Sequence, residues 1–425
     1  MLRSKRKSDS GLLALDMETR DVGLQMHPTN VLYLTTDTYW ASIRRLLNRH
    51  YQVIACAYFD IPGGVVTVTV KRESTTLYAG KIFLPLSRSS AILRLVANPV
   101  ILVAYAVILS IFLRFKTKRN FDVCLAANYW LGLSAILLRC MGIVKKMVYW
   151  ATDWFPQART RGKSFLNTNH IRSIIGDLLF LYADRLTANL ADSVWNLTYR
   201  IAEARLKKWR DRLKVTHQLV VYPPLTHQYL DMNSVARNKP EKRIVFLGRL
   251  RKGRGLEPVI DAIANLSEHD IQVDFLIIGR SKDDPNYANR ILKRVVDKGV
   301  INNIKLPGFL PIEEVRQILC TSLVGIALFE GKENISNFAF PAKVVHYLES
   351  GIPIVVSKDS ALATEVVSNG IGLVVEYTAK SLEQVFSLML SDAKLVRKLR
   401  AAVREYVTRM SSGENLYKAI ESVRY

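Results

Sequence analysis

Residues 325–357 read GIALFEGKENISNFAFPAKVVHYLESGIPIVVS, and the order of segments in this stretch decides the fold. An apolar run of strand length is followed by a polar loop, by a helical segment from Pro341 to Gly351, and by a second apolar strand. Pro at the start of a helix and Gly just past its end are the expected boundaries. The stretch therefore predicts a βαβ unit. In such folds, anions bind where a loop enters a helix beside the carboxyl ends of strands.

A second stretch, RIVFLGRLRKGRGLEPVIDAIANL at 243–266, combines a buried strand, a basic Gly-rich turn and an amphipathic helix. Two guanidinium groups in the turn, Arg249 and Arg254, would form a site for a diphosphate together with backbone amides at the helix N-terminus. The alternative is a basic surface loop without a ligand. A later strand, VDFLIIGRS, ends at Gly279, where the backbone can approach a ligand closely.

The segment 340–357 resembles the nucleotide-sugar segment of retaining glycosyltransferases of family 4, which are two-domain GT-B enzymes. Relatives that act on polysaccharides or lipid carriers commonly read Pro-x-Lys-x-x-Glu-Tyr-x-x-x-Gly-x-Pro-Val there. The matching positions are Pro341, Lys343, Tyr347, Gly351 and Pro353. The basic turn is similar to the family's Gly-Arg-Leu-x-x-x-Lys-Gly, with Arg254 in place of the Lys. Its other matching positions are Gly248, Arg249, Leu250 and Gly255.

Two positions depart from the family pattern. The family's ribose-binding Glu falls on His346, and its partner Glu, eight residues earlier, falls on Phe338. We expect neutral His346 to accept a hydrogen bond from a ribose hydroxyl. Glu349 on the same helix face, or a loop acid at Glu330 or Glu333, would supply the negative charge. The alternative is that His346 packs the helix and donor affinity is weak.

The resemblance implies an α/β fold of the GT-B class, in which two Rossmann-like domains face a central cleft. It also implies a UDP- or GDP-linked sugar as donor, with no cofactor and no metal, because cationic side chains offset the charge of the leaving diphosphate. The residues expected to carry that charge are Arg249, Arg254 and Lys343. The residues expected to bind the donor are Gly248, Gly279, Gly308, Glu330, Phe340, Pro341, His346 and Glu349.

Length and charge set further limits. The 425 residues suggest two or three domains, and the net charge of +23 favours acidic membranes, phosphorylated substrates or nucleic acid as partners. No nucleic-acid-binding module is recognisable, so we expect no nucleic-acid partner. The cysteines lie far apart without metal-ligand spacing, which favours reduced core residues in a cytosolic protein. They are Cys56, Cys124, Cys140 and Cys320.

Residues 96–113, VANPVILVAYAVILSIFL, form an uncharged apolar run that is followed by Arg114, Lys116, Lys118 and Arg119. The length is at the threshold for a transmembrane helix. A single crossing, however, would put strands of one sheet on opposite sides of a bilayer. The run is therefore either a buried core helix or a monotopic, in-plane membrane element. The second alternative predicts a cytoplasmic protein held on the inner face of the plasma membrane by an anionic lipid surface.

The predicted strand in KMVYWATDWFP, residues 146–156, leads to Thr152 and Asp153 and resembles the family's acceptor-side loop. Asp153 would orient an acceptor hydroxyl or act as a general base. The alternative is a turn or helix-capping Asp. Further along, the sequence predicts a helix, a short strand at 185–191 (RLTANLA) and another helix.

We expect a disordered leader at 1–28, an acceptor domain at 29–221, a linker at 222–240, a nucleotide-sugar domain at 241–390, and C-terminal helices at 391–425, the last crossing back to the first domain. The predicted function is transfer of a sugar from a nucleotide diphosphate sugar to a lipid-linked or polysaccharide acceptor, as in bacterial surface or exopolysaccharide synthesis. The alternatives are a non-catalytic GT-B subunit that binds a sugar nucleotide or a partner enzyme, and a GT-B sugar-nucleotide epimerase.

Overall fold

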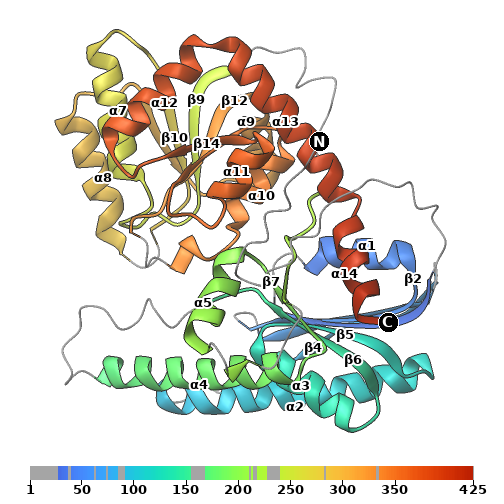
Figure 1. Cartoon of the computed structure of the whole chain (residues 1–425). Helices are drawn as coiled ribbons and strands as arrows, with labels where there is room; N and C mark the ends of the chain where they lie inside the picture. Colours follow the sequence, from blue (N-terminus) through green and yellow to red (C-terminus); the bar gives the residue numbers. More distant parts are fainter. Residues whose placement is uncertain are drawn as a thin grey trace. The chain divides into compact units, whose positions relative to one another are not determined.

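The chain divides into two compact units (Figure 1). The N-terminal unit comprises Met1–Pro224 and Gly413–Tyr425, and the C-terminal unit comprises Leu225–Ser412. The predicted leader up to residue 26 and most of the predicted linker lie outside the described residues. The structure, a computed structural model, describes residues 27–36, 40–61, 64–72, 75–84, 91–154, 168–209, 212–213, 218–226, 240–281, 284–331 and 335–424.

The N-terminal unit is built on one sheet with the strand order β4-β3-β2-β1-β5-β6-β7-β8. The central strands are parallel, and β3 and β4 extend the sheet as antiparallel strands at one edge. Valine and aromatic residues are frequent among the buried strand residues, as expected for a sheet covered on both faces. The strands are β1 (His27–Thr35), β2 (Tyr51–Asp60), β3 (Val65–Arg72), β4 (Thr75–Phe83), β5 (Phe121–Ala127), β6 (Val144–Ala151), β7 (Ser193–Asn196) and β8 (Gln218–Val220).

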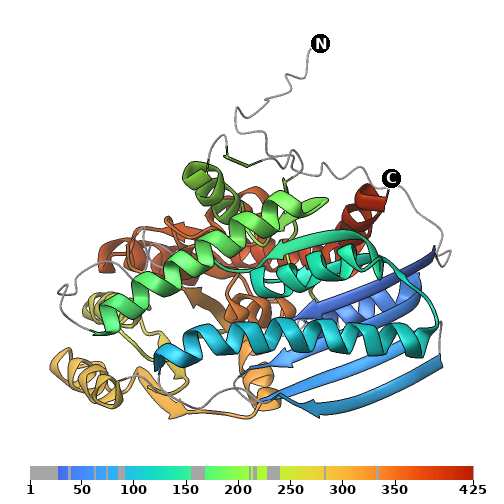
Figure 2. The same cartoon turned by 90° about the horizontal axis from the view of Figure 1, so that it is seen from below.

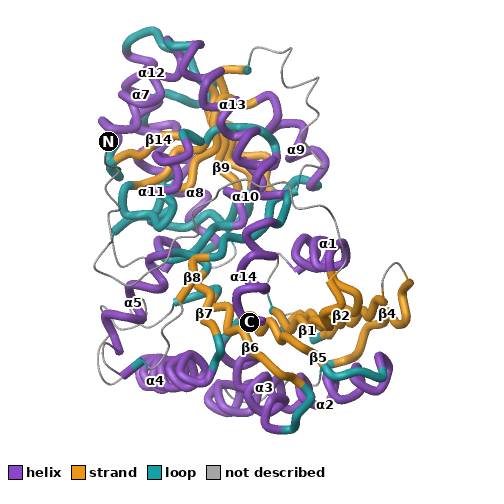
Figure 3. The backbone as a smooth tube through the Cα atoms, turned by 45° about the vertical axis from the view of Figure 1, so that its right-hand side comes forward, coloured by secondary structure: helices purple, strands orange, loops and turns teal. Residues whose placement is uncertain are grey.

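Helices cover both faces of this sheet (Figure 3). One core cluster joins the sheet to α2 and α3 through residues such as Leu109 and Leu131. The other joins it to α1 and to the last helix, α14, through Leu47 and Ile420. The chain thus returns to the N-terminal unit at its end. The helices are α1 (Trp40–His50), α2 (Ala91–Thr117), α3 (Tyr129–Cys140), α4 (Thr168–Leu190), α5 (Tyr199–Trp209) and α14 (Glu414–Arg424).

The predicted short strand at 185–191 is wrong. Helix α4 continues to Leu190, and the strand that follows is β7 at Ser193–Asn196. Thr187 is buried, and its hydroxyl donates a hydrogen bond to the carbonyl of Tyr129 at the start of α3 (3.2 Å), which holds this last part of α4 as a helix against α3. Asp192 directly precedes β7, and its carboxylate accepts a hydrogen bond from the backbone N–H of Met147 (2.8 Å).

The apolar run at 96–113 lies within α2, a long helix that contains Pro99. Its length and composition alone would allow it to cross a membrane, although only a third of its apolar window is buried. One side of the helix, including Leu102 and Leu113, packs against the sheet, while Val100 and Ile108 on the other side are exposed. Because β4 and β5, the strands before and after α2, belong to one sheet, the helix lies along that sheet.

The C-terminal unit has an all-parallel sheet with the order β11-β10-β9-β12-β13-β14. Its strands are β9 (Glu241–Leu247), β10 (Asp274–Ile278), β11 (Ile304–Gly308), β12 (Ser322–Ala327), β13 (Ile354–Ser357) and β14 (Gly372–Val375). Its helices are α7 (Leu256–Glu268), α8 (Pro285–Asp297), α9 (Ile312–Thr321), α10 (Ala342–Glu349), α11 (Ala363–Asn369), α12 (Ala379–Ser391) and α13 (Ala393–Ser411), with a short 3-10 turn, η2, at Ile335–Asn337.

The βαβ unit predicted for residues 325–357 is confirmed as β12, α10 and β13, with the two strands parallel and adjacent. Pro341 caps the start of α10, and Gly351 follows its end. The Tyr347 ring packs so closely on Gly325 that a Cβ there would lie 2.4 Å from the ring. The Tyr347 hydroxyl also accepts a hydrogen bond from the backbone N–H of Leu247 (2.8 Å). Tyr347 therefore fixes α10 to β9 and β12.

Candidate active site

The candidate site lies where the strand order of the C-terminal sheet reverses. From β9 the chain proceeds to β10 and β11 on one side, and it then returns to β12 on the other side of β9. At such a reversal the loops that follow the two neighbouring strands diverge, and open α/β sheets bind ligands in the crevice expected between them. We call the loops after β9 and β12 at the carboxyl edge of this sheet the crevice. The two sequence motifs singled out above, at 248–255 and 340–357, begin at or near this edge.

The ends of β9, β10 and β11 are held together by glycine backbone. The N–H of Gly248 donates to the carbonyl of Ile278 (2.9 Å), and the N–H of Gly279 donates to the carbonyl of Gly308 (2.8 Å). A Cβ on Gly279 would lie 1.8 Å from the carbonyl oxygen of Gly248, so only glycine fits there. The structure thus brings together the predicted donor-binding glycines Gly248, Gly279 and Gly308.

Lys343 reaches from the first turn of α10 to the end of β9. Its Nζ lies 3.8 Å from the centre of the Phe246 ring and 5.7 Å from the centre of the Phe329 ring. Its aliphatic end also covers Gly248, where a Cβ would lie 3.6 Å from Cε. The Nζ atom is buried and has no hydrogen-bond partner among the residues that the structure describes.

Arg254, from the basic turn, approaches the same aromatic wall. Its guanidinium carbon lies 5.0 Å from the centre of the Phe329 ring, and its Nε is buried without a hydrogen-bond partner in the described part of the chain. Neither Arg254 nor Lys343 forms an ion pair with a described acidic residue. Removing two cationic groups from water without a nearby negative charge lowers the stability of the folded protein, unless a bound anion supplies that charge.

This arrangement lowers the pKa of both Lys343 and Arg254. Burial, and to a lesser extent the nearby charge of Arg254, holds the pKa of Lys343 well below its usual value. Burial lowers the pKa of Arg254 to about 10, with further contributions from Arg251 and Arg249. Arg249 is exposed on the same turn. A bound anion would reverse both shifts, because it supplies the missing negative charge.

Two helices begin at the crevice. Pro341 caps α10 without a side-chain hydrogen bond, and Gly255 caps α7, also without one. The backbone N–H of Gly255 donates to the hydroxyl of Tyr377 (2.9 Å), so this amide is engaged within the protein. The backbone N–H of Glu330, in the loop after β12, donates to the carbonyl of Gly253 (3.1 Å), which joins the two loops of the crevice.

The remaining predicted donor residues lie around α10. His346 is half-buried, and burial, followed by the charge of Arg316, lowers its pKa, so its imidazole is neutral at neutral pH. Glu349 is buried, and its carboxylate accepts hydrogen bonds from the Thr226 N–H (2.9 Å) and hydroxyl (2.8 Å). Phe338 and Phe340 are also buried. Glu333, the other loop acid considered, lies outside the described residues.

Sequence reasoning missed the aromatic side chains of the crevice. Phe246 and Phe329 form the wall on which Lys343 and Arg254 lie, although both read as ordinary apolar strand or loop residues. Phe309 is 70% exposed just after β11, and the Arg280 guanidinium lies 5.6 Å from the centre of its ring. Phe309 directly follows a Pro-Gly pair at the end of a predicted strand, and that position was the sequence signal that could have identified it as a candidate ligand contact.

Asp153 belongs to the N-terminal unit, where it follows the carboxyl end of β6. Its side chain is exposed, yet the crowded surroundings raise its pKa to about 6 through desolvation, against a hydrogen bond from Thr152. The next residue, Trp154, is buried with the Arg205 guanidinium 5.8 Å from its ring centre. Arg205 forms a fully buried ion pair with Asp184 (2.8 Å), so the loop that carries Asp153 has a firm anchor.

Comparison with known structures identifies the fold as GT-B. A sucrose-phosphate synthase from Thermosynechococcus elongatus superposes with a TM-score of 0.61 at 14% identity, covering 93% of this chain and 99% of that one. A glycosyltransferase from Rickettsia africae superposes with a TM-score of 0.62 at 13% identity, covering 93% of this chain and 98% of that one. Anabaena HepE in complex with UDP and glucose superposes with a TM-score of 0.58 at 13% identity, covering 93% of this chain and 100% of that one.

Within this fold, residues 229–408 match the family model described as "Glycosyl transferases group 1". The matched range lies inside the C-terminal unit and contains the whole crevice with its cations. No curated protein matches the chain.

Proposed function

We propose that the protein is a glycosyltransferase that moves a sugar from a UDP- or GDP-linked donor to an acceptor. The observation that carries this proposal is the position of Lys343 and Arg254 at the crevice of the C-terminal sheet. Lys343 Nζ and Arg254 Nε are buried there, and neither side chain forms an ion pair with a described acidic residue. The match of residues 229–408 to a glycosyltransferase family supports it. HepE, which has a similar fold, is described in complex with UDP and glucose.

In this proposal the diphosphate of the donor occupies the crevice between the two loops. Lys343 and Arg254, with Arg249 from the exposed part of the turn, offset the negative charge that grows on the diphosphate as the sugar leaves. Fixed positive groups aimed at developing charge are often the largest catalytic contribution of a protein. The N-terminus of α10 adds a favourable dipole. Assignment to family 4 and retention of the anomeric configuration follow from the sequence resemblance and belong to the proposal.

The acceptor is proposed to be lipid-linked or a polysaccharide, in bacterial surface or exopolysaccharide synthesis. Asp153 would orient its hydroxyl group or take its proton. The exposed position of Asp153 after a strand end, on a loop fixed by Trp154, suits such a role.

A second candidate function is that of a non-catalytic subunit that binds a sugar nucleotide or a partner enzyme. The observation in its favour is that His346 and Phe338 stand where the resembling family has carboxylates, while Glu349 is hydrogen-bonded to Thr226. A catalytic subunit turns over its donor, whereas a binding subunit only holds it.

The experiment that tests the proposal is calorimetric titration with a panel of UDP- and GDP-sugars, followed by a donor-hydrolysis assay with those that bind. The glycosyltransferase proposal predicts slow release of the nucleoside diphosphate, and its loss in Lys343→Met. Binding without any release would support the second candidate. Absence of binding for every donor, with a folded protein, would contradict both.

A further inference from the structure

One helix-covered side of the N-terminal unit carries an apolar surface that is larger than the sequence indicated. Helices α2, α3 and α4 lie side by side on one face of the sheet (Figure 2). Each has an apolar stripe on the side that is not buried, with residues three or four positions apart as expected for one helix face. The stripes consist of Val100, Ala104 and Ile108 on α2, Trp130, Leu133 and Leu137 on α3, and Leu178, Tyr182, Leu186 and Leu190 on α4. We call them the three-helix face.

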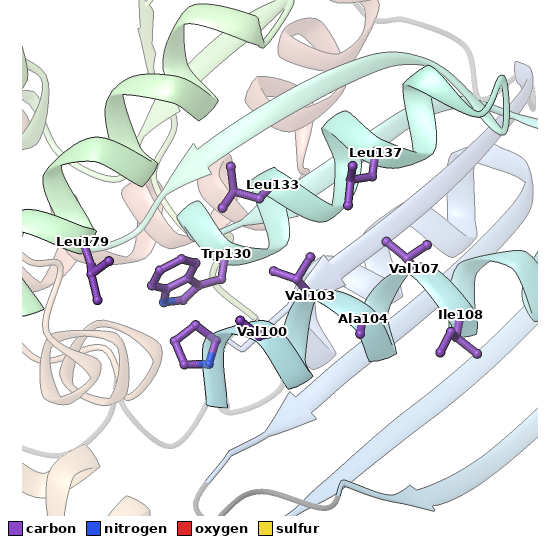
Figure 4. Close-up of a pocket in the computed structure, with 10 residues that line it drawn as sticks. Val100, Val103, Ala104, Val107, Ile108, Trp130, Leu133, Leu137 and Leu179 are labelled. Carbon is purple, nitrogen blue, oxygen red and sulfur yellow. The ribbon is translucent and has the colours of Figure 1, made fainter. Parts of the chain in front are cut away.

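A groove runs within the three-helix face. Its cavity volume is about 590 Å³, and every residue that lines it is apolar. Figure 4 shows side chains of α2 and α3, among them Val103, Val107 and Leu137, lining the two sides of this groove, with Trp130 near one end. Apolar patches of this extent are uncommon on monomeric proteins and usually mark an interaction site. The absence of polar side chains in the groove favours a hydrocarbon ligand, which has no hydrogen bond to satisfy.

Basic residues gather at one end of the same face. Because α2 and α3 both run antiparallel to the central strands, they end at the edge where β5 and β6 begin. Three cations at this edge are ion-paired: Arg139 (3.0 Å) and Lys146 (3.6 Å) with Asp192, and Lys145 with Asp122 (2.8 Å). Four others form no ion pair with any described residue. They are Arg114, Lys116, Lys118 and Arg119.

We infer that the three-helix face docks on the surface of an anionic phospholipid bilayer, with one acyl chain in its groove and lipid phosphates at its unpaired basic edge. The charge favours a bilayer over a protein partner, because four cations that form no ion pair with a described residue border an otherwise apolar surface. Ile108 and Arg114 are separated by roughly 9 Å along α2 at the usual helical rise. One lipid is therefore long enough to place its acyl chain against Ile108 and its phosphate near Arg114. The contact is monotopic, because Leu102 and Leu113 hold α2 along the sheet.

Flotation of the full-length protein with vesicles tests this inference. We expect binding to vesicles of phosphatidylcholine with phosphatidylglycerol, and much weaker binding to phosphatidylcholine alone. High salt is expected to weaken the binding but not to abolish it, because apolar insertion resists salt. Equal binding to both vesicle types would contradict the role of the basic edge. No binding to either, together with a face-dependent dimer in sedimentation, would overturn the inference in favour of a second copy of the chain.

The residues chosen for substitution are exposed, so the variants are expected to fold like the wild type. Val100→Ser, Ile108→Ser and Leu186→Ser together are expected to weaken vesicle binding by roughly tenfold or more. The matched control is Val296→Ser, Ile301→Ser and Val367→Ser, which removes comparably exposed apolar residues from the C-terminal unit and should change nothing. Lys116→Gln, Lys118→Gln and Arg119→Gln are expected to weaken binding to the anionic vesicles on the order of a hundredfold. Lys293→Gln, Lys380→Gln and Lys398→Gln are the charge control.

Trp130 reports on the groove itself. Lipids with bromine on the acyl chain are expected to quench part of the protein's fluorescence, and Trp130→Phe should remove that part. Trp150, Trp154, Trp195 and Trp209 are buried in the fold and should contribute little. Vesicle binding without any quenching that depends on Trp130 would contradict the acyl chain in the groove. The measurement needs no nucleotide sugar, so its outcome is independent of the proposed glycosyl transfer.

Discussion

The Nζ atom of Lys343 lies 3.8 Å from the centre of the Phe246 ring and has no hydrogen-bond partner among the described residues. The lysine comes from α10 and the phenylalanine from β9, so the contact joins the segments that carry the two sequence motifs, 340–357 and 243–266. An aromatic face stabilises a cation only partly when the cation is removed from water. The ring therefore supplies no counter-charge, and the amine remains available to pair with a bound anion.

The first prediction concerns the stability of the donor-free protein. A buried amine without a partner lowers stability, so Lys343→Met, which keeps the length and loses the polar group, should leave the free energy of unfolding unchanged or raise it by about 1 kcal/mol. Urea denaturation of the wild type and of Lys343→Met measures this difference in the free energy of unfolding. A large loss of stability would mean that Lys343 has a structural partner, and Lys343→Arg serves as the control that keeps the charge.

The second prediction is proton uptake on donor binding. In the empty site the pKa of Lys343 is held well below its usual value, chiefly by burial. A bound diphosphate raises that pKa, so the complex holds more protons than its components in the pH window between the two values. Donor affinity should therefore fall as pH rises through this window.

Calorimetry of donor binding in buffers with different ionisation enthalpies measures the uptake. Lys343→Arg should abolish it, because a guanidinium stays charged throughout the window. Uptake of the same size in Lys343→Arg would assign the proton to another group.

The third prediction separates His346 from Glu349 on α10. If neutral His346 accepts a ribose hydroxyl, His346→Ala should weaken donor binding by about 1 kcal/mol, the net value of one hydrogen bond. Glu349→Gln should instead lower the free energy of unfolding by about 1–3 kcal/mol, because its carboxylate accepts two hydrogen bonds from Thr226 in a buried place. If Glu349→Gln weakened donor binding and His346→Ala did not, Glu349 and not His346 would be the residue that contacts the donor.

The fourth prediction is a loss of activity in acid. The surroundings of Asp153 raise its pKa to about 6, and a group that accepts a proton or a hydroxyl hydrogen bond must be ionised. With an identified acceptor, kcat/KM should fall as pH falls through that value. Asp153→Asn should have a low kcat/KM at every pH and lack this dependence. An acid limb that persists in Asp153→Asn would exclude the residue as its source.

Much of the C-terminal unit could be predicted from the sequence, because each local signal agrees with the fold. The strand before Gly248, the Gly-rich turn and the helix after Pro341 all appear where the pattern places them. The error at 185–191 has a physical cause. Leu, Ala and Thr there fit either a short buried strand or a helix, and the choice depends on packing of Thr187 against the start of α3, which no local pattern reveals.

The candidate site was predictable in its charges but not in its surroundings. Arg254 and Lys343 were identified from the motifs, whereas the aromatic wall of Phe246 and Phe329 depends on which strands become neighbours. The same limit applies to the N-terminal unit. The apolar run at 96–113 is plain in the sequence, but its continuation over α3 and α4 needs the three helices to be side by side.

The most direct test of the central claim, that Lys343 and Arg254 hold the diphosphate of a sugar nucleotide, is the turnover of an accepted donor by Lys343→Met and Arg254→Met beside the wild type. Each variant is expected to lose on the order of 2–4 kcal/mol of transition-state stabilisation, measured as kcat/KM, while its circular dichroism stays unchanged. Turnover close to that of the wild type in both folded variants would contradict the account.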